Sequence, residues 1–310
     1  MLEKAESGLI VELVTIRTSG DERPASGAAV ATKLARSPSP VELAAAERPS
    51  DKSRFVKEIE DALLCGAADL AVHSAKDVPG DLPDGLAIVG VPARADARDA
   101  LCGGERSLAD LPAGARVGTS SLRRRAQLLA ARDDLEVVDL RGNVDTRLRR
   151  LADGDFDAVV LAAAGLARLG RPEGEPIGLG EMTPAPGQGC LALEARADDA
   201  HAAELAARLT DHAALLRLTA ERTVTAALEA SCQTPIGVHA ELSDEGSRLA
   251  LESFVGLPDG GAWIRDRVEG DAATPSEVGS MAATRLLSAG AAELLGQAEK
   301  SSPFADRSRG

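Results

Sequence analysis

The sequence predicts a protein with two α/β units followed by a smaller α+β module. A chain of 310 residues has room for two or three domains. Up to about residue 161, short apolar stretches of strand length alternate with helical patterns, which is typical of α/β units. The last third instead carries three strand candidates between helices, which is the pattern of an α+β module. Aromatic residues make up only 2% of the chain, so Ala, Leu and Val are expected to build the core.

The first α/β unit begins with an alternating strand candidate over residues 9–16. The segment over 17–53 is rich in Ser, Pro and Ala, and we expect it to contain a mobile loop. Apolar residues at helical spacing then predict a helix over 55–64. Two short buried strands are expected over 69–73 and 87–91.

A hinge is expected over 93–98, and the second α/β unit begins at Arg116. Its strands and helices alternate, so we expect parallel pairing. The expected strands are 116–118, 136–140 and 158–161, and the expected helices are 122–132 and 144–152. A further strand over 187–194 is expected to return toward the first unit.

The C-terminal module is expected to begin with Ala-rich helices within 199–230. Its strand candidates are 236–242, 248–254 and 262–268. One long helix over 275–297 should follow, and the polar tail from residue 298 is expected to fray.

The chain is acidic overall, with a formal net charge of −14, yet its arginines concentrate between Arg116 and Arg150. Nine arginines and five acids leave this stretch locally positive. A guanidinium group can bond both oxygens of a carboxylate or phosphate, so the stretch indicates a site for a small polyanion. The low pI near 4.9 and the scarce aromatics argue against a nucleic-acid or anionic-membrane partner.

The four cysteines are widely spaced and form no CxxC pair, so no metal site is predicted. Cys65, Cys102 and Cys190 are expected to be small buried residues. Cys232 lies in an expected loop, where a thiol can be a nucleophile or a covalent anchor; the alternative is a fourth buried cysteine. Without an apolar signal core or an apolar run of about 18–20 residues, a cytoplasmic protein is expected.

Two polar turns follow neighbouring expected strands. Residues 119–121 precede Arg123 and Arg124, which lie in the first turn of a helix. Taken alone, this pattern fits a capped helix with solvated arginines. Arg141 and Arg147 flank a second turn of the same design. Because open α/β sheets bind ligands at the carboxyl ends of their strands, the repeat favours an anion site.

Asp77 follows the expected strand over 69–73. A carboxylate in a cleft can stabilise a cation or move a proton. The alternative is a turn residue before Pro79, and the local sequence leaves both interpretations open.

These features, in this order, resemble the porphobilinogen deaminase family, whose members are also called hydroxymethylbilane synthases. The matching stretches are 72–79 (VHSAKDVP), 117–124 (VGTSSLRR), 140–148 (LRGNVDTRL) and 229–237 (EASCQTPIG), with shorter ones at 15–21, 55–58, 163–166 and 186–189. Each motif is moderately specific, and the ordered set is highly specific.

The resemblance implies two periplasmic-binding-protein-like domains with an active cleft between them, followed by an α+β domain. It implies that Cys232 holds a dipyrromethane cofactor by a thioether bond. Members of the family join four porphobilinogen molecules head to tail, releasing ammonia from each, to form the linear tetrapyrrole hydroxymethylbilane. Each pyrrole carries an acetate and a propionate, so the growing chain is a polyanion.

The resemblance also implies roles for individual residues. Asp77 would be catalytic, stabilising the electron-poor pyrrole left when ammonia departs. The cofactor contacts besides Cys232 would be Lys76, Thr119, Ser121, Arg123, Arg124, Arg141 and Gly165. The substrate contacts would be Arg147, Arg168, Gln188 and Lys52.

The expected domains are 1–92 with 191–208, then 97–187, then 214–297, with a flexible tail over 298–310. The chain starts after the family's first strand and Arg-x-Ser loop, so the first domain is expected to be incomplete at its N-terminus. The expected partners are porphobilinogen and the growing pyrrole chain, with no metal, nucleic acid or membrane, and the resemblance implies a monomer. The alternative is a non-catalytic or impaired polycarboxylate-binding protein of the same fold.

Overall fold

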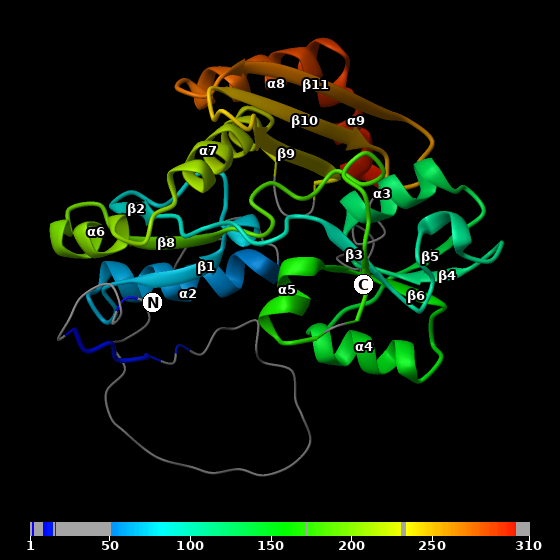
Figure 1. Cartoon of the computed structure of the whole chain (residues 1–310), viewed down its shortest axis with the longest axis horizontal. Helices are drawn as coiled ribbons and strands as arrows, with labels where there is room; N and C mark the ends of the chain where they lie inside the picture. The colour runs from blue at the N-terminus through cyan, green and yellow to red at the C-terminus, as the bar shows by residue number, and fades with distance from the viewer. Residues whose placement is uncertain are drawn as a thin grey trace.

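The computed structural model describes residues 2, 9–14, 16, 51–171, 173–230 and 234–301. Over these ranges the chain builds three sheets, each packed against helices. Figure 1 shows them as three bodies, which we call the first, second and third domains in order of their first strand. The prediction of two α/β domains and a C-terminal α+β domain is confirmed.

The first sheet has the order β1-β8-β2, and β8 runs antiparallel to both neighbours. Its strands are β1 (Ala71–Ser74), β2 (Leu86–Gly90) and β8 (Leu191–Arg196). The helices of this domain are α2 (Asp51–Leu64), the short η1 (Ala75–Asp77) and α6 (Ala200–Ala207). The predicted return of the chain to the first domain is confirmed, although β8 begins four residues later than expected because residues 187–190 form a turn.

Two expectations for the first domain are wrong over the described residues. The structure has no strand over 9–14, where Ile10 is 88% and Leu13 91% exposed. Alternation predicts a strand only where one face becomes buried, and neither of these side chains is. The loop expected over 17–53 ends earlier, because α2 begins at Asp51; residues 17–50 lie outside the described part.

The second sheet has the order β5-β4-β6-β3-β7. Its strands are β3 (Asp99–Cys102), β4 (Arg116–Gly118), β5 (Glu136–Val138), β6 (Ala158–Ala162) and β7 (Glu175–Pro176). Strand β4 is parallel to β5 and β6, as predicted, whereas β3 is antiparallel to both β6 and β7. The helices are η2 (Leu108–Asp110), α3 (Leu122–Ala131), α4 (Val144–Ala152) and α5 (Ala163–Arg168).

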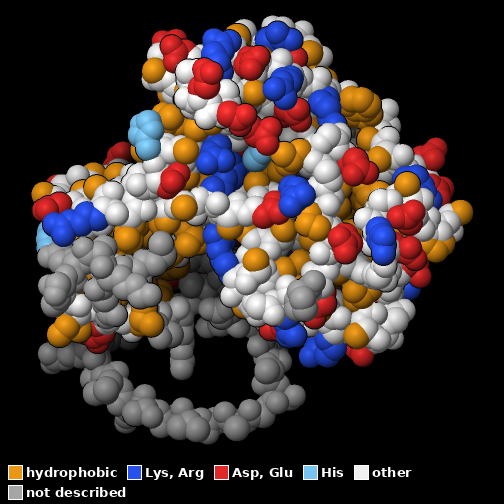
Figure 2. Space-filling view, in the orientation of Figure 1, with side chains coloured by type: hydrophobic (Ala, Val, Ile, Leu, Met, Phe, Trp, Pro, Cys, Tyr) orange, Lys and Arg blue, Asp and Glu red, His pale blue; other side chains and the backbone are white. Residues whose placement is uncertain are grey.

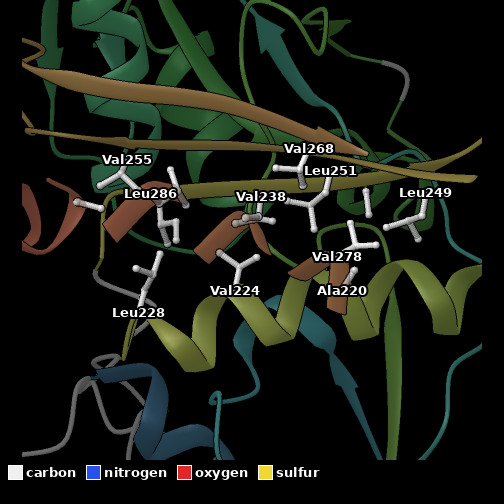
Figure 3. Close-up of a cluster of buried hydrophobic side chains, with 14 of the residues drawn as sticks. Ala220, Val224, Leu228, Val238, Leu249, Leu251, Val255, Val268, Val278 and Leu286 are labelled. Atoms are coloured by element: carbon white, nitrogen blue, oxygen red, sulfur yellow. The ribbon is translucent and has the colours of Figure 1, made fainter. Parts of the chain in front are cut away.

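The third sheet is an antiparallel meander of the order β11-β10-β9. Its strands are β9 (Ile236–Leu242), β10 (Arg248–Gly256) and β11 (Trp263–Asp271), and its helices are α7 (His212–Ala227), α8 (Pro275–Ser288) and α9 (Ala291–Ser301). Figure 3 shows Val224 of α7 and Leu286 of α8 meeting the apolar side chains of the sheet. This core contains small aliphatic side chains, as the composition predicted.

The single helix expected over 275–297 is wrong, because Gly290 interrupts it with a φ of +98°. The left-handed region suits glycine and ends a helix. The expected start of the flexible tail is also wrong, since α9 continues to Ser301 and Ala298 is only 1% exposed.

Cys102 and Cys190 are buried as expected, and burial raises the pKa of each thiol to about 11. Cys65 is exposed, contrary to expectation, because it follows the end of α2 in a turn with Gly66. Among the described residues, no helix combines the length and the apolar composition needed to cross a bilayer.

Candidate active site

A cavity of about 690 Å³ lies where the three domains meet. The first domain contributes residues 75–81, which follow β1, and the second contributes Ser121, Arg123 and Arg124 at the start of α3. The remaining lining residues are Ala185, Pro186 and Gln188, then Arg222, Thr225, Ala226, Glu229, Ala230, Thr234 and Ile236 from the third domain and its approach. The cavity therefore collects Asp77, Lys76, Ser121, Arg123, Arg124 and Gln188 from the predicted site residues.

Two chain segments cross between the first and second domains beside this cavity, and hydrogen bonds join them. The backbone N–H of Ala95 donates to Gly189 O at 3.1 Å, and Arg94 Nε donates to Gln188 O at 2.9 Å. Gly189 has a φ of +87°, and a Cβ there would lie 2.5 Å from Ala95 O. The hinge predicted over 93–98 is thus one half of a hydrogen-bonded pair of crossings.

Glu221 of α7 ties these crossings to the third domain. It is fully buried, and Arg94 Nη1 donates to its Oε1 at 2.6 Å. The backbone N–H groups of Gly187 and Ala240 donate to the same carboxylate at 2.6 and 2.8 Å. The sequence reasoning missed Glu221, although a lone acid on an Ala-rich helix face is a usable signal.

The predicted anion site at the start of α3 has the expected cap. Ser121 Oγ accepts from the backbone N–H of Arg124 at 3.4 Å, and Thr119 Oγ1 accepts from the N–H of Ser121 at 3.2 Å. Arg123 and Arg124 are only 4% and 5% exposed, rather than solvated. Thr119 is buried and does not line the cavity.

Both buried arginines bond Asp99, a residue that the sequence reasoning did not single out. Arg123 Nη1 donates to Asp99 Oδ2 at 2.7 Å, and Arg124 Nε and Nη2 donate to Oδ1 at 2.9 and 2.7 Å. Burial disfavours the charged form of Asp99, but the two guanidinium groups outweigh burial and hold its pKa far below the usual range. For Arg123, burial lowers the pKa while Asp99 opposes the shift.

The other predicted arginines lie at the same edge of the second sheet without lining the cavity. Arg141 follows β5, and its Nε donates to Asp139 Oδ2 at 3.1 Å. Arg147 Nε donates to Gly142 O at 2.8 Å, and burial, followed by the charge of Arg124, lowers the Arg147 pKa.

Helix α5 follows β6 at this edge and carries Gly165 and Arg168. Arg168 Nη2 donates to the Gly189 carbonyl at 2.7 Å, so it contacts a domain crossing. A Cβ at Gly165 would meet nothing within 4 Å among the described residues. The parallel pairing of β4, β5 and β6 therefore brings the predicted second-domain residues to one edge, as the strand-end argument expected.

Lys76 and Asp77 lie in η1, directly after β1, and both line the cavity. Lys76 Nζ donates to Gln188 Oε1 at 3.3 Å. Arg222 of α7 secures the loop that follows, since its Nη2 donates to the carbonyls of Pro79 and Gly80 at 2.8 Å each. The third domain therefore holds the loop that directly follows Asp77.

Two predicted site residues lie wholly or partly outside the described part of the structure. Cys232 lies outside the described residues, but Ala230 and Thr234 on either side of it line the cavity. Lys52 lies in α2 by its backbone, and its side chain is outside the described part.

Two protein-family models match the chain. "Porphobilinogen deaminase, dipyromethane cofactor binding domain" matches residues 1–204, and "Porphobilinogen deaminase, C-terminal domain" matches residues 215–288. The porphobilinogen deaminase of Deinococcus radiodurans is 49% identical over 249 residues, which cover 79% of this chain and 80% of that protein. The porphobilinogen deaminase of Roseiflexus sp. is 45% identical over 300 residues, covering 95% and 91%.

Among solved structures, a putative periplasmic sulfonate-binding protein from Methylobacillus flagellatus covers 54% of this chain and 50% of its own. Its identity to this chain is 16% and the TM-score is 0.30. The family models and the relatives, by contrast, span most of the sequence. The chain belongs to the porphobilinogen deaminase family.

Proposed function

We propose that this protein is a hydroxymethylbilane synthase, which joins four porphobilinogen molecules head to tail and releases ammonia from each. One observation carries the proposal: Asp77 and two buried arginines line a single cavity, and so do residues on both sides of Cys232. A polycarboxylate-binding protein would use the arginines. It needs neither a carboxylate beside the bound ligand nor a thiol for covalent attachment.

The residues present fit a dipyrromethane group. Its acetate and propionate side chains call for cationic and hydroxyl donors, and the cavity wall offers Lys76, Arg123, Arg124 and Ser121. Arg123 Nε is buried without a hydrogen-bond partner among the described residues, which suits a donor for a bound carboxylate. About 690 Å³ also lies within the usual range of small-molecule sites. Cys232 would hold the group, which supplies the pyrrole that primes chain growth.

The arginine cluster would bind the carboxylates of porphobilinogen and of the growing chain. Asp99 offsets one of the two guanidinium charges, so Asp99, Arg123 and Arg124 together keep one positive charge. Burial and then the charge of Arg124 lower the pKa of Arg147, so Arg147 lies near enough to Arg124 to add to this positive potential. Partly dry surroundings strengthen such attractions relative to bulk water.

Asp77 would act on the reacting pyrrole. When ammonia leaves the aminomethyl group, the ring becomes electron-poor, and a carboxylate facing its N–H stabilises the positive charge. The α-carbon of a second pyrrole then attacks this electron-poor unit, and as the new carbon–carbon bond forms, that second ring loses the hydrogen on its α-carbon as a proton, which Asp77 can accept and pass on. The loop contacts of Arg222 hold this region in place at the cavity wall.

A porphobilinogen assay tests the proposal. We expect turnover by the full chain and a loss of roughly 10²–10⁴-fold in kcat for Asp77→Asn, the usual contribution of a positioned acid or base. Asp84→Asn, an exposed change outside the cavity, is the matched control and should keep the wild-type rate. Intact mass spectrometry should show a dipyrromethane adduct that Cys232→Ser removes. Carboxylate binding without turnover or adduct would instead identify a binding protein.

The monomeric state and the cytoplasmic location implied by the family belong to the same proposal. Light scattering on the purified chain tests the first, and cell fractionation tests the second.

A further inference from the structure

Asp99 carries a fully buried carboxylate. It opens β3, immediately after the first crossing enters the second domain. Its two oxygens accept from Arg123, from Arg124 and, at 3.0 Å, from Gln188 Nε2. All three of these partners line the cavity, whereas Asp99 does not.

The bonds to Asp99 fix where the guanidinium groups lie. Arg123 and Arg124 are adjacent on the first turn of α3, and their like charges would drive them apart without a carboxylate between them. Backbone carbonyls complete the arrangement, because Arg123 Nη1 also donates to Thr183 O and Arg124 Nη1 donates to Val160 O. The groups that hold the two arginines therefore do not line the cavity themselves. Arg123 Nε has no partner among the described residues.

Gln188 extends the network to the first domain. Its Nε2 donates to Asp99 Oδ1 and to Ala97 O, and its Oε1 accepts from Lys76 Nζ. An unbroken series of bonds thus runs from Asp99 to the residue next to Asp77. The cations on both walls of the cavity are connected through one buried carboxylate.

We propose that Asp99 is a positioning residue for carboxylate binding, which presents Arg123 and Arg124 to the ligand and sets Lys76 through Gln188. The proposal rests on the proposed function, since the carboxylates are those of porphobilinogen and the pyrrole chain. Asp99 touches neither substrate nor cofactor and acts through the arginines.

Asp99→Asn keeps the shape and removes the charge. An amide cannot accept from both arginines with both its terminal atoms, so at least one guanidinium group loses its bond. We expect KM for porphobilinogen to rise about 10- to 100-fold, the loss that one charge-assisted hydrogen bond produces, with kcat changing less than about threefold. Adding Asp99→Asn to Arg123→Gln should raise KM by much less than it does in the wild type.

Asp199→Asn is the control for simple destabilisation. Asp199 caps α6 and pairs with Arg196 away from the cavity, so this variant should lower Tm and leave KM unchanged. If Asp99→Asn behaves in the same way, or if its effect on KM simply adds to that of Arg123→Gln, the positioning role is wrong.

A second measurement does not depend on turnover. In the Cys232→Ser chain, citrate should raise Tm more than sodium chloride of equal ionic strength, and Asp99→Asn should abolish most of that difference. An undiminished citrate effect overturns the proposal for Asp99. A wild-type chain that shows no turnover, together with a citrate effect that requires Asp99, overturns the enzymatic function and keeps the positioning role.

Discussion

The arginines between Arg116 and Arg150 differ mainly in the partners that their N–H groups reach. Arg123 and Arg124 share the buried Asp99, whereas Arg132 and Arg150 pair with Asp134 and Asp155 at the surface. Arg125, which follows Arg124 on α3, donates to Val137 O at 2.6 Å. Sequence can locate such a cluster, but tertiary contacts decide which guanidinium group faces a ligand.

Asp99 should leave a signature in the pH dependence of stability. Its pKa is lower in the folded chain than the value of about 3.9 expected when unfolded. The ionised group therefore stabilises the fold fully above the unfolded pKa and loses this effect as the pH falls toward the folded pKa. We expect the difference in unfolding free energy between wild type and Asp99→Asn to be constant above about pH 5 and to shrink below about pH 4.

Urea unfolding of both chains at several pH values measures this difference. The exposed Asp84→Asn variant supplies the baseline and should match the wild type at neutral pH. A difference that stays the same down to pH 3 would contradict the assignment of the depressed pKa to Asp99.

At the scale of elements, prediction succeeded where local signals were complete. Helix α4 has the expected bounds, because Asn143 caps it, accepting from the Thr146 N–H at 2.8 Å, and Gly142 makes the turn before it. Strand β3 was missed, since its four residues follow the crossing without a turn signal. The pattern over 9–16 failed for the opposite reason, as alternation alone does not create a buried face.

The break between α8 and α9 lies at Gly290. Gly290→Ala places a side chain at a φ of +98°, so we expect a loss of about 1–2 kcal/mol in unfolding free energy. Gly296→Ala is a matched control within α9, where a Cβ meets nothing within 4 Å; it should stabilise the chain by roughly 0.5–1 kcal/mol. Urea unfolding compares the two, and equal effects of the same sign would show that the turn does not depend on Gly290.

At the scale of the whole molecule, the site could be predicted as a set of motifs but not as a connected structure. Figure 2 shows acidic and basic side chains interspersed over the visible face, so the net charge of −14 does not form one acidic patch there. The ordered motifs located Asp77, Lys76 and the arginines of α3, which line one cavity. Asp99 and Glu221 were missed because their roles come from partners far away in the sequence.

The carboxylate of Glu221 contacts both domain crossings and the third sheet. It accepts from Arg94 on one crossing, from Gly187 on the other and from Ala240 of β9, and Figure 1 shows α7 between the third sheet and the first domain. Glu221→Gln leaves Arg94 buried without its countercharge, so we expect a loss of about 3–5 kcal/mol in unfolding free energy. Glu204→Gln, which removes an exposed partner of Arg208, should cost less than about 1 kcal/mol.

Removing both charges separates the cost of an unpaired ion from the loss of a domain contact. The double variant Arg94→Met and Glu221→Met should be less destabilised than Glu221→Gln, because no buried charge remains uncompensated. Hydrogen exchange should still accelerate over 91–98 and 187–190 in both variants, since each removes the charged acceptor of the Gly187 N–H. Unchanged exchange in these segments would mean that the crossings hold each other in place, through the Ala95–Gly189 bond, without support from the third domain.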